Sequence, residues 1–244
     1  MKNYYYDLHI HSCLSPCADN ENTPNNIAGM VSLCGLDIAA LTDHNTCKNC
    51  PAFFEAARNF GIVPIAGMEL TTAEDIHMIC LFEVLEDALD FSESVDKNRV
   101  KIKNRTEIFG EQLIYDKADN IIGTEENLLP NATVLDLSAA DKLVKRFGGI
   151  CYPAHIDRQA NGIISVLGAM PESPAFDFVE YNLSRNIEDY TLKYGLSDKK
   201  TIVSSDAHYL TDFRDKESFF TLDCADADEN VIRHELFKFL RGEK

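Results

Sequence analysis

The chain has 244 residues, of which 45% are hydrophobic and 26% are charged, a composition that is ordinary for a globular protein. Its length suits one α/β domain with a single core. Its 40 acidic side chains outnumber 23 basic ones, and the formal net charge of −17 disfavours sequence-independent attraction to the phosphates of long nucleic acids. The charge therefore favours a small or locally recognised substrate.

The sequence also bears on the cellular compartment. No segment reaches the roughly 18 uninterrupted apolar residues that a membrane helix needs, and the N-terminal residues lack the apolar stretch of a secretory signal. The eight cysteines then indicate free thiols in a reducing compartment rather than a disulfide framework. We expect a cytoplasmic protein that does not bind a membrane.

Short apolar runs and longer helix-like runs alternate from the N-terminus onward. The composition and periodicity predict strands over 4–10, 37–42, 62–66 and 76–83, and helices over 23–34 and 52–60. The stretch of about 86–130 is more polar and carries a Lys/Arg run at 97–105. We interpret this stretch as a helical or polar insertion, and the basic run as a solvated helix face.

Beyond the insertion the same alternation returns. A helix is expected over 137–147, strands over 150–154, 176–181 and 201–205, and an amphipathic helix over 229–240, with 218–222 as a possible extra strand. Seven main strands separated by helices are typical of a parallel sheet or (β/α) barrel. We expect residues 1–244 to form one such domain.

Six of the seven histidines fall at the ends of predicted strands, and only His234 lies on a helix away from them. Loops at one end of a parallel α/β barrel build its active site, so these six side chains are expected to converge. The six are His9, His11, His44, His77, His155 and His208.

Two pairs have the spacing of a metal chelate. His9 and His11 project from the same face of one strand, and Asp206 and His208 repeat that spacing after another. Any one of these residues alone is more simply a hydrogen-bonded core or surface side chain. As a set, imidazoles with carboxylates indicate a site for divalent zinc, manganese or iron.

Five motifs of the chain resemble those of the PHP (polymerase and histidinol phosphatase) family, and they occur in order over nearly its whole length. The resemblance implies a distorted seven-stranded (β/α) TIM-like barrel with two or three divalent metal ions, which hydrolyses phosphomonoesters or phosphodiesters. The motifs are Asp7-Leu8-His9-Ile10-His11-Ser12, Thr42-Asp43-His44-Asn45, Gly67-Met68-Glu69, Pro153-Ala154-His155 and Ser205-Asp206-Ala207-His208.

The resemblance also implies ligand sets. One metal ion would be held by His9, His11, Glu69 and Asp206, and a second by Glu69, His77 and His155, with Glu69 bridging the two. A third site would use Asp19, His44 and His208. The family usually has Ser-Asp-Gly shortly after its H-x-H motif, whereas this chain has Ser15-Pro16-Cys17-Ala18-Asp19-Asn20, so Asp19 is the counterpart only if three residues are inserted.

Catalysis and phosphate binding need further groups. A hydroxide bridging two metal ions would attack phosphorus in line, and Asp206 or His208 would pass a proton to the leaving oxygen. Arg158, three residues after His155, is a candidate for binding the phosphate, with Arg185 second and Lys48 weaker. The alternative for each of these three cations is a solvated surface charge.

Four cysteines flank the first two histidine motifs. Cys13, Cys17, Cys47 and Cys50 could together bind zinc or an iron–sulfur cluster. Only the second pair has a recognised ligand spacing, so we favour buried free thiols, with a redox pair as a lesser alternative.

The residues therefore predict hydrolysis of a small phosphomonoester or short phosphodiester, such as a sugar phosphate or a nucleotide. A nuclease acting on DNA or RNA ends is the second hypothesis, against which the acidic balance argues. A metal-binding regulatory module without turnover is the third. Phosphate release, degradation of labelled strands, or metal binding without either activity would distinguish them.

Overall fold

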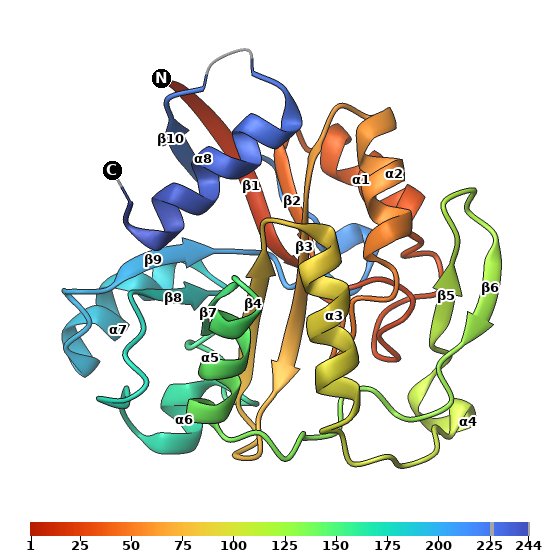
Figure 1. Ribbon diagram of the computed structural model, residues 1–244. Helices are drawn as coiled ribbons and strands as arrows, with labels where there is room; N and C mark the ends of the chain where they lie inside the picture. The colour runs from red at the N-terminus through yellow and green to blue at the C-terminus, as the bar shows by residue number, and fades with distance from the viewer. Residues whose placement is uncertain (225–226, 244) are drawn as a thin grey trace.

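The computed structural model describes residues 1–224 and 227–243. Its largest sheet has six strands in the order β10-β1-β2-β3-β4-β7 and curls into a half-barrel (Figure 1). The first three strands in sequence are parallel, whereas β4 is antiparallel to β3 and β7, and β10 is antiparallel to β1. The strands are β1 (Lys2–Ile10), β2 (Ile38–Leu41), β3 (Val63–Thr71), β4 (His77–Phe82), β7 (Ile150–Pro153) and β10 (Phe219–Leu222).

Two strands form a separate parallel pair, β8 (Phe178–Tyr181) and β9 (Lys200–Val203). An isolated parallel bridge between Ile10 and Ala207 places the segment after β9 beside the end of β1. Asp7 strengthens this junction, because its Oδ1 accepts hydrogen bonds from the backbone N–H groups of His9, at 3.2 Å, and Ser205, at 3.1 Å.

All seven expected strands and the extra one are present, but within residues 1–224 and 227–243 they do not form one closed, seven-stranded parallel barrel. The chain turns directly from β3 into β4 without an intervening helix, and a connection that short can join only antiparallel strands. The expectation of a regular β-then-α alternation was wrong at this point.

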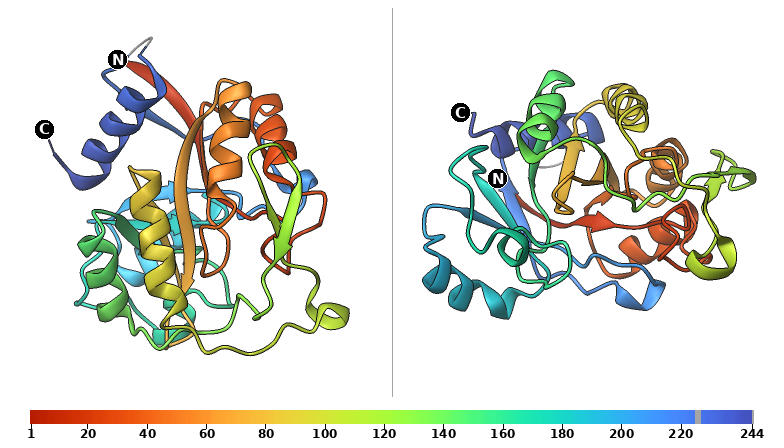
Figure 2. Two further views of the ribbon diagram at one scale, coloured as in Figure 1. Left: turned by 45° about the vertical axis from the view of Figure 1, so that its right-hand side comes forward. Right: turned by 90° about the horizontal axis from the view of Figure 1, so that it is seen from below.

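Helices cover both faces of the sheet. In the right-hand view of Figure 2, α5, α3, α2 and α1 follow one another around the outside of the curl, and Figure 1 shows α8 apart from them at the upper left. The buried apolar residues accordingly form two clusters, one under the outer helices and one between the sheet and α8. The helices are α1 (Pro24–Leu33), α2 (Cys50–Asn59), α3 (Leu85–Asp96), α5 (Leu137–Arg146) and α8 (Glu229–Arg241), with shorter α4 (Thr106–Phe109), α6 (Ile163–Leu167) and α7 (Ile187–Tyr194).

Capping residues set where several helices begin. The Thr23 side chain accepts a hydrogen bond from the backbone N–H of Asn26 and precedes Pro24 at the start of α1. Asp136 caps α5 and Asp228 caps α8 in the same way. These interactions satisfy backbone donors that the first turn leaves unpaired.

The stretch of 86–130 contains more than a helical excursion. Helix α3 packs Ala88, Phe91 and Val95 into the core. A hairpin follows, formed by β5 (Leu113–Tyr115) and β6 (Ile121–Thr124), which stands at the right edge of Figure 1 and which the sequence did not predict. The basic run is no helix face, because α3 ends at Asp96, and Arg99 is buried against Asp96 and the Asn127 carbonyl.

No helix in the described part of the chain is long and apolar enough to cross a lipid bilayer.

Candidate metal centre

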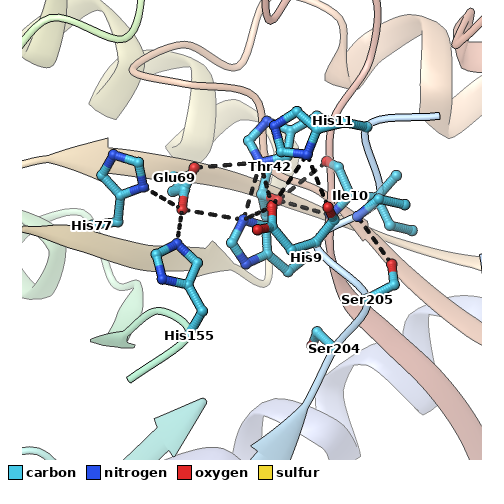
Figure 3. A network of polar contacts seen from close by, with 12 residues as sticks. His9, Ile10, His11, Thr42, Glu69, His77, His155, Ser204 and Ser205 are labelled. Carbon is cyan, nitrogen blue, oxygen red and sulfur yellow. Dashed lines mark hydrogen bonds and ion pairs between the residues drawn. The ribbon is translucent and has the colours of Figure 1, made fainter. Parts of the chain in front are cut away.

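A cluster of imidazoles and carboxylates lies at one edge of the half-barrel, where β1, β2, β3 and β7 end and β4 begins (Figure 3). All the predicted ligands except Asp19 gather there: His9, His11, His44, Glu69, His77, His155, Asp206 and His208.

The sequence did not indicate how His77 comes to lie at this edge. It is the first residue of β4 rather than a residue following a strand, and it pairs with Thr71 at the end of β3. Because β3 and β4 are antiparallel, the start of one strand meets the end of the other. The pairing places His77 beside Glu69, two residues before Thr71.

The Glu69 carboxylate is the centre of the cluster. It is 1% exposed, and five imidazoles surround it, more than the roughly four lone-pair sites that a carboxylate offers. Its Oε1 lies 2.7 Å from His77 Nδ1, 3.0 Å from His155 Nε2 and 3.3 Å from His9 Nε2, and its Oε2 lies 2.9 Å from His44 Nδ1 and 3.3 Å from His11 Nε2.

Close packing brings Glu69 to this position. A Cβ atom added at Gly67 would lie 2.8 Å from Thr42 Cγ2 and 2.9 Å from Leu81 Cδ2. Only glycine therefore lets β3 approach its neighbours so closely, two residues before Glu69.

Asp206 is a second buried carboxylate. Its Oδ1 lies 3.2 Å from His9 Nε2 and 3.3 Å from His11 Nε2, while its Oδ2 accepts a hydrogen bond from Arg158. Asp206 has φ 54° and His155 has φ 26°, backbone conformations that cost energy in residues with a side chain. Backbone strain of this kind is concentrated at functional sites.

Among the residues that the structure describes, three groups of donor atoms are close enough to share a cation, each with its atoms within 4.8 Å of one another. The groups are His9 with His11 and Asp206, His44 with Glu69 and His77, and His11 with His44 and His208. From the described residues 1–224 and 227–243, buried Glu69 Oε2 and Asp206 Oδ1 accept no well-aligned hydrogen bond. Imidazole nitrogens and open carboxylate oxygens suit zinc, manganese or iron, so the residues present fit the metal centre that the sequence predicts.

The structure does not bring Asp19 into any of these groups. Its Oδ1 accepts a hydrogen bond from the backbone N–H of Glu21 at 2.8 Å. The thiol of Cys17 instead lies against His44 and His208. Desolvation alone would raise the pKa of this thiol, but the neighbouring His44 and His208 lower it to about 5.

The carboxylates and the histidines of the cluster shift one another's pKa values strongly. Burial would raise the pKa of Glu69, but His77, His9 and His44 hold it well below its ordinary value. Burial would likewise lower the pKa of His9, but Glu180, Asp206 and Glu69 hold it well above 6.5. The pKa of His77 is lowered, mainly by burial.

Outer residues orient the two histidines of the H-x-H pair. His9 Nδ1 lies 2.8 Å from Glu180 Oε1, and His11 Nδ1 lies 2.9 Å from Ser15 Oγ, which donates to Asp43. With Nδ1 engaged, each ring presents Nε2 to the centre, the usual arrangement of metal-binding histidines.

Sequence reasoning missed Glu180. It is fully buried on β8, and its Oε1 also accepts a hydrogen bond from the backbone N–H of His155. The signal was a lone acidic residue within the apolar strand Phe178–Tyr181. A buried carboxylate is costly unless it is paired, so its presence there indicated a buried cationic or imidazole partner.

We expect Glu180→Gln to weaken metal binding about 10- to 100-fold, because it removes the charge that orients and polarises His9. Competition with a chromophoric chelator measures the affinity. Glu217→Gln makes the same change at an exposed residue that accepts a hydrogen bond from Ser184, and it should leave the affinity unchanged. Equal affinities for Glu180→Gln and wild type would show that Glu180 only fills space.

The three candidate cations lie in different surroundings. Arg158 lines a cavity of about 100 Å³ over the cluster. Arg185 is exposed and does not line it. Lys48 is paired with Glu125. Only Arg158 is therefore placed to contact a ligand at the cluster.

A larger cavity of about 420 Å³ adjoins the first and shares His44, His77 and Asn161 with it. Its other lining residues are mostly apolar and include Phe109, Leu128 and Pro130 from the stretch of 86–130.

The four cysteines do not form one cluster. Cys47 and Cys50 are buried, and their Sγ atoms point to the Gly67 carbonyl. Cys13 is buried, and burial raises its pKa to a value at which the thiol stays protonated. Cys17 alone of the four contacts the histidines.

Known proteins resemble this chain in sequence and in fold. The family model "PHP domain" matches residues 7–161. The uncharacterized protein MJ1587 of Methanocaldococcus jannaschii is 29% identical over 100 residues, which cover 37% of this chain and 58% of that protein.

Solved structures share the fold at low sequence identity. The lesion-specific endonuclease PfuEndoQ of Pyrococcus furiosus superposes with a TM-score of 0.71 at 16% identity, covering 99% of this chain and 56% of that one. Endonuclease Q bound to a 27-mer duplex with an abasic lesion gives 0.70 at 17%, covering 99% and 57%. A provisionally named metal-dependent phosphoesterase of Bifidobacterium adolescentis gives 0.57 at 16%, covering 96% of each chain. The chain thus spans 56 to 58% of the length of MJ1587 and the two endonuclease chains.

Proposed function

The chain belongs to the PHP domain family, and from this premise we propose that it hydrolyses a small phosphate ester with two or three divalent metal ions. The observation that carries the proposal is the Glu69 carboxylate, which lies within 3.3 Å of five imidazole nitrogens. Burying so many charged and polar groups together is costly unless cations lie between them.

Each donor group has a place in this proposal. His9, His11 and Asp206 would hold one ion, and Glu69, His77 and His155 another, with Glu69 between them and His44 near enough to contribute. When bound, the metal ions would supply Lewis-acid activation of water and of the phosphoryl group. Zinc, manganese and iron all suit these donors.

The remaining residues position the substrate. The Arg158 guanidinium donates a hydrogen bond to Asp206. On substrate binding it would turn to the phosphoryl oxygens, which a planar guanidinium binds in a bidentate manner. His208, 19% exposed in its side chain, would give a proton to the leaving oxygen when it holds no metal ion. Burial would raise the pKa of Asp206, but His9 and His11 hold it below its ordinary value, so this carboxylate would stay ionised. The leaving group would occupy the 420 Å³ cavity against Phe109 and Leu128.

Cavity size and charge support a small substrate. The cavity over the cluster, about 100 Å³, suits one phosphoryl group, and the larger one suits a sugar or a base. The net charge of −17 disfavours a long polyanion.

Phosphate release from a panel of nucleotides and sugar phosphates tests the proposal, with zinc, manganese or iron added. We expect wild type to turn over at least one compound and His9→Ala to abolish turnover. His234→Ala is the matched control, because His234 lies on α8 and contacts Glu83 away from the centre. Metal binding without turnover of any phosphate ester would favour a regulatory module instead.

Arg158→Ala is expected to raise KM about 10- to 100-fold with a smaller change in kcat, because a charge-assisted hydrogen bond contributes about 1.5–3 kcal/mol. Arg158→Lys should restore part of the loss, and Arg185→Ala should have no effect. Steady-state kinetics on the best substrate separates the two constants. A change in kcat alone would assign Arg158 to positioning Asp206.

A nuclease is the second candidate, favoured by the likeness to Endonuclease Q in complex with a DNA duplex. That likeness, at 17% identity, concerns the fold. Labelled single strands and duplexes with an abasic lesion, incubated under the same metal conditions, decide between the candidates. Cleavage of DNA without release of phosphate from small esters would replace the first proposal with the second.

A further inference from the structure

The loop that carries Cys17 is held in place at several points. The backbone N–H of Asp19 donates to the His208 carbonyl at 2.9 Å, and that of Ala18 donates to the Ser15 carbonyl at 2.9 Å. A Cβ atom added at Gly110 would lie 2.5 Å from the Pro16 carbonyl oxygen, so the end of α4 packs tightly on the same loop. Cys17 therefore has a defined position.

That position is beside two histidines of the centre. Cys17 lines the larger cavity with His44, and its thiol is close enough to the imidazoles of His44 and His208 to interact with both. The His208 and His11 rings stack at 4.2 Å, and the His11 and His44 ring centroids are 4.5 Å apart.

The free ring nitrogens of these histidines are suited to a metal ion. His208 Nδ1 lies 2.9 Å from the Asp206 backbone carbonyl, which leaves Nε2 as its open nitrogen. His44 Nδ1 lies 2.9 Å from Glu69, so Nε2 is left for a different partner. Among the three groups of close donors, the group of His11, His44 and His208 is the one that contains no carboxylate.

We propose that Cys17 is a metal ligand, whose sulfur joins His44 and His208 in a third metal site in place of Asp19. The inference rests on the proposed metal centre and concerns this one ligand. The Asp19 carboxylate accepts a hydrogen bond from the backbone N–H of Glu21, whereas the Cys17 sulfur is close to both histidines. On binding, the S–H bond breaks, its proton leaves to solvent and a sulfur–metal bond forms, with no change of oxidation state.

Sulfur changes which metal the site selects. Thiolate and imidazole ligands favour zinc or iron, whereas manganese and magnesium favour carboxylates and water. The third site should therefore fill with zinc under conditions in which manganese occupies only the carboxylate-containing sites.

Titration of the metal-free protein with cobalt(II) tests this ligand without measuring activity. Thiolate coordination to cobalt gives an intense sulfur-to-metal charge-transfer absorption in the near ultraviolet. We expect wild type and Cys34→Ser to develop this band and Cys17→Ser to lack it, with cobalt affinity at that site lowered at least about 100-fold, the upper range for residues that only support ligands. Cys17→Asp should bind cobalt at that site without the band.

The outcomes separate the two proposals. Cobalt binding without the band in wild type, or a band that persists in Cys17→Ser, overturns the assignment of Cys17 and leaves the metal centre standing. Loss of one bound cobalt in Asp19→Asn but not in Cys17→Ser also overturns it. If wild type binds no cobalt, the metal centre itself fails, and the inference fails with it.

Discussion

Glu69→Gln is expected to lower kcat/KM by about 10³-fold or more. The substitution keeps the shape of the side chain but removes the negative charge that five imidazole nitrogens surround. A neutral amide cannot balance two cations, so metal content should fall together with activity.

Metal analysis after dialysis and phosphate release measure both effects. Glu126→Gln makes the same change at an exposed residue and should leave metal content and activity unchanged. Circular dichroism of Glu69→Gln checks that the fold persists. Full metal content with activity within tenfold of wild type would contradict a bridging role for Glu69.

Removing the metal ions should lower the free energy of unfolding by several kcal/mol, and by more at higher pH. A ligand present at about 1,000 times its dissociation constant stabilises a protein by about 4 kcal/mol. Each histidine that must lose a proton to bind metal adds about 1.4 kcal/mol per pH unit to that difference.

The metal-free protein should respond to pH in the opposite sense. Carboxylates, together with Cys17 at His44 and His208, raise the pKa of His9, His44 and His208 above 6.5, despite desolvation. A raised pKa stabilises the folded protein fully below pH 6.5, and that contribution is lost as the pH rises through the raised value. The lowered pKa values of His77 and of Cys17, about 5 for the thiol, act in the reverse direction, two groups against three.

Chemical denaturation from pH 6 to 9 with zinc or with a chelator measures both trends. We expect the zinc-loaded and metal-free curves to diverge as the pH rises. Parallel curves would show that these histidines do not lose protons to metal. The exposed His234 provides a control, because His234→Ala should leave the divergence unchanged.

Local patterns in the chain determined much of the fold. Helices α1, α5 and α8 begin where Thr23, Asp136 and Asp228 cap them. The hairpin β5–β6 was missed because its strands are only three and four residues long and lie in a polar stretch. Its position depends on Asn49, whose side chain bonds the backbone of Leu113 and Tyr115.

The sequence by itself predicted that six histidines would meet, because strand ends share one edge of a sheet and the spacing of His9 with His11 puts both on one face. The resemblance to the PHP family added Glu69 to that set. Only the tertiary structure decided which atoms meet there. Contacts between residues far apart in the chain placed Glu180 behind His9, turned Asp19 toward Glu21 and brought Cys17 against His44 and His208. Such contacts depend on how loops pack on one another, which no local periodicity encodes.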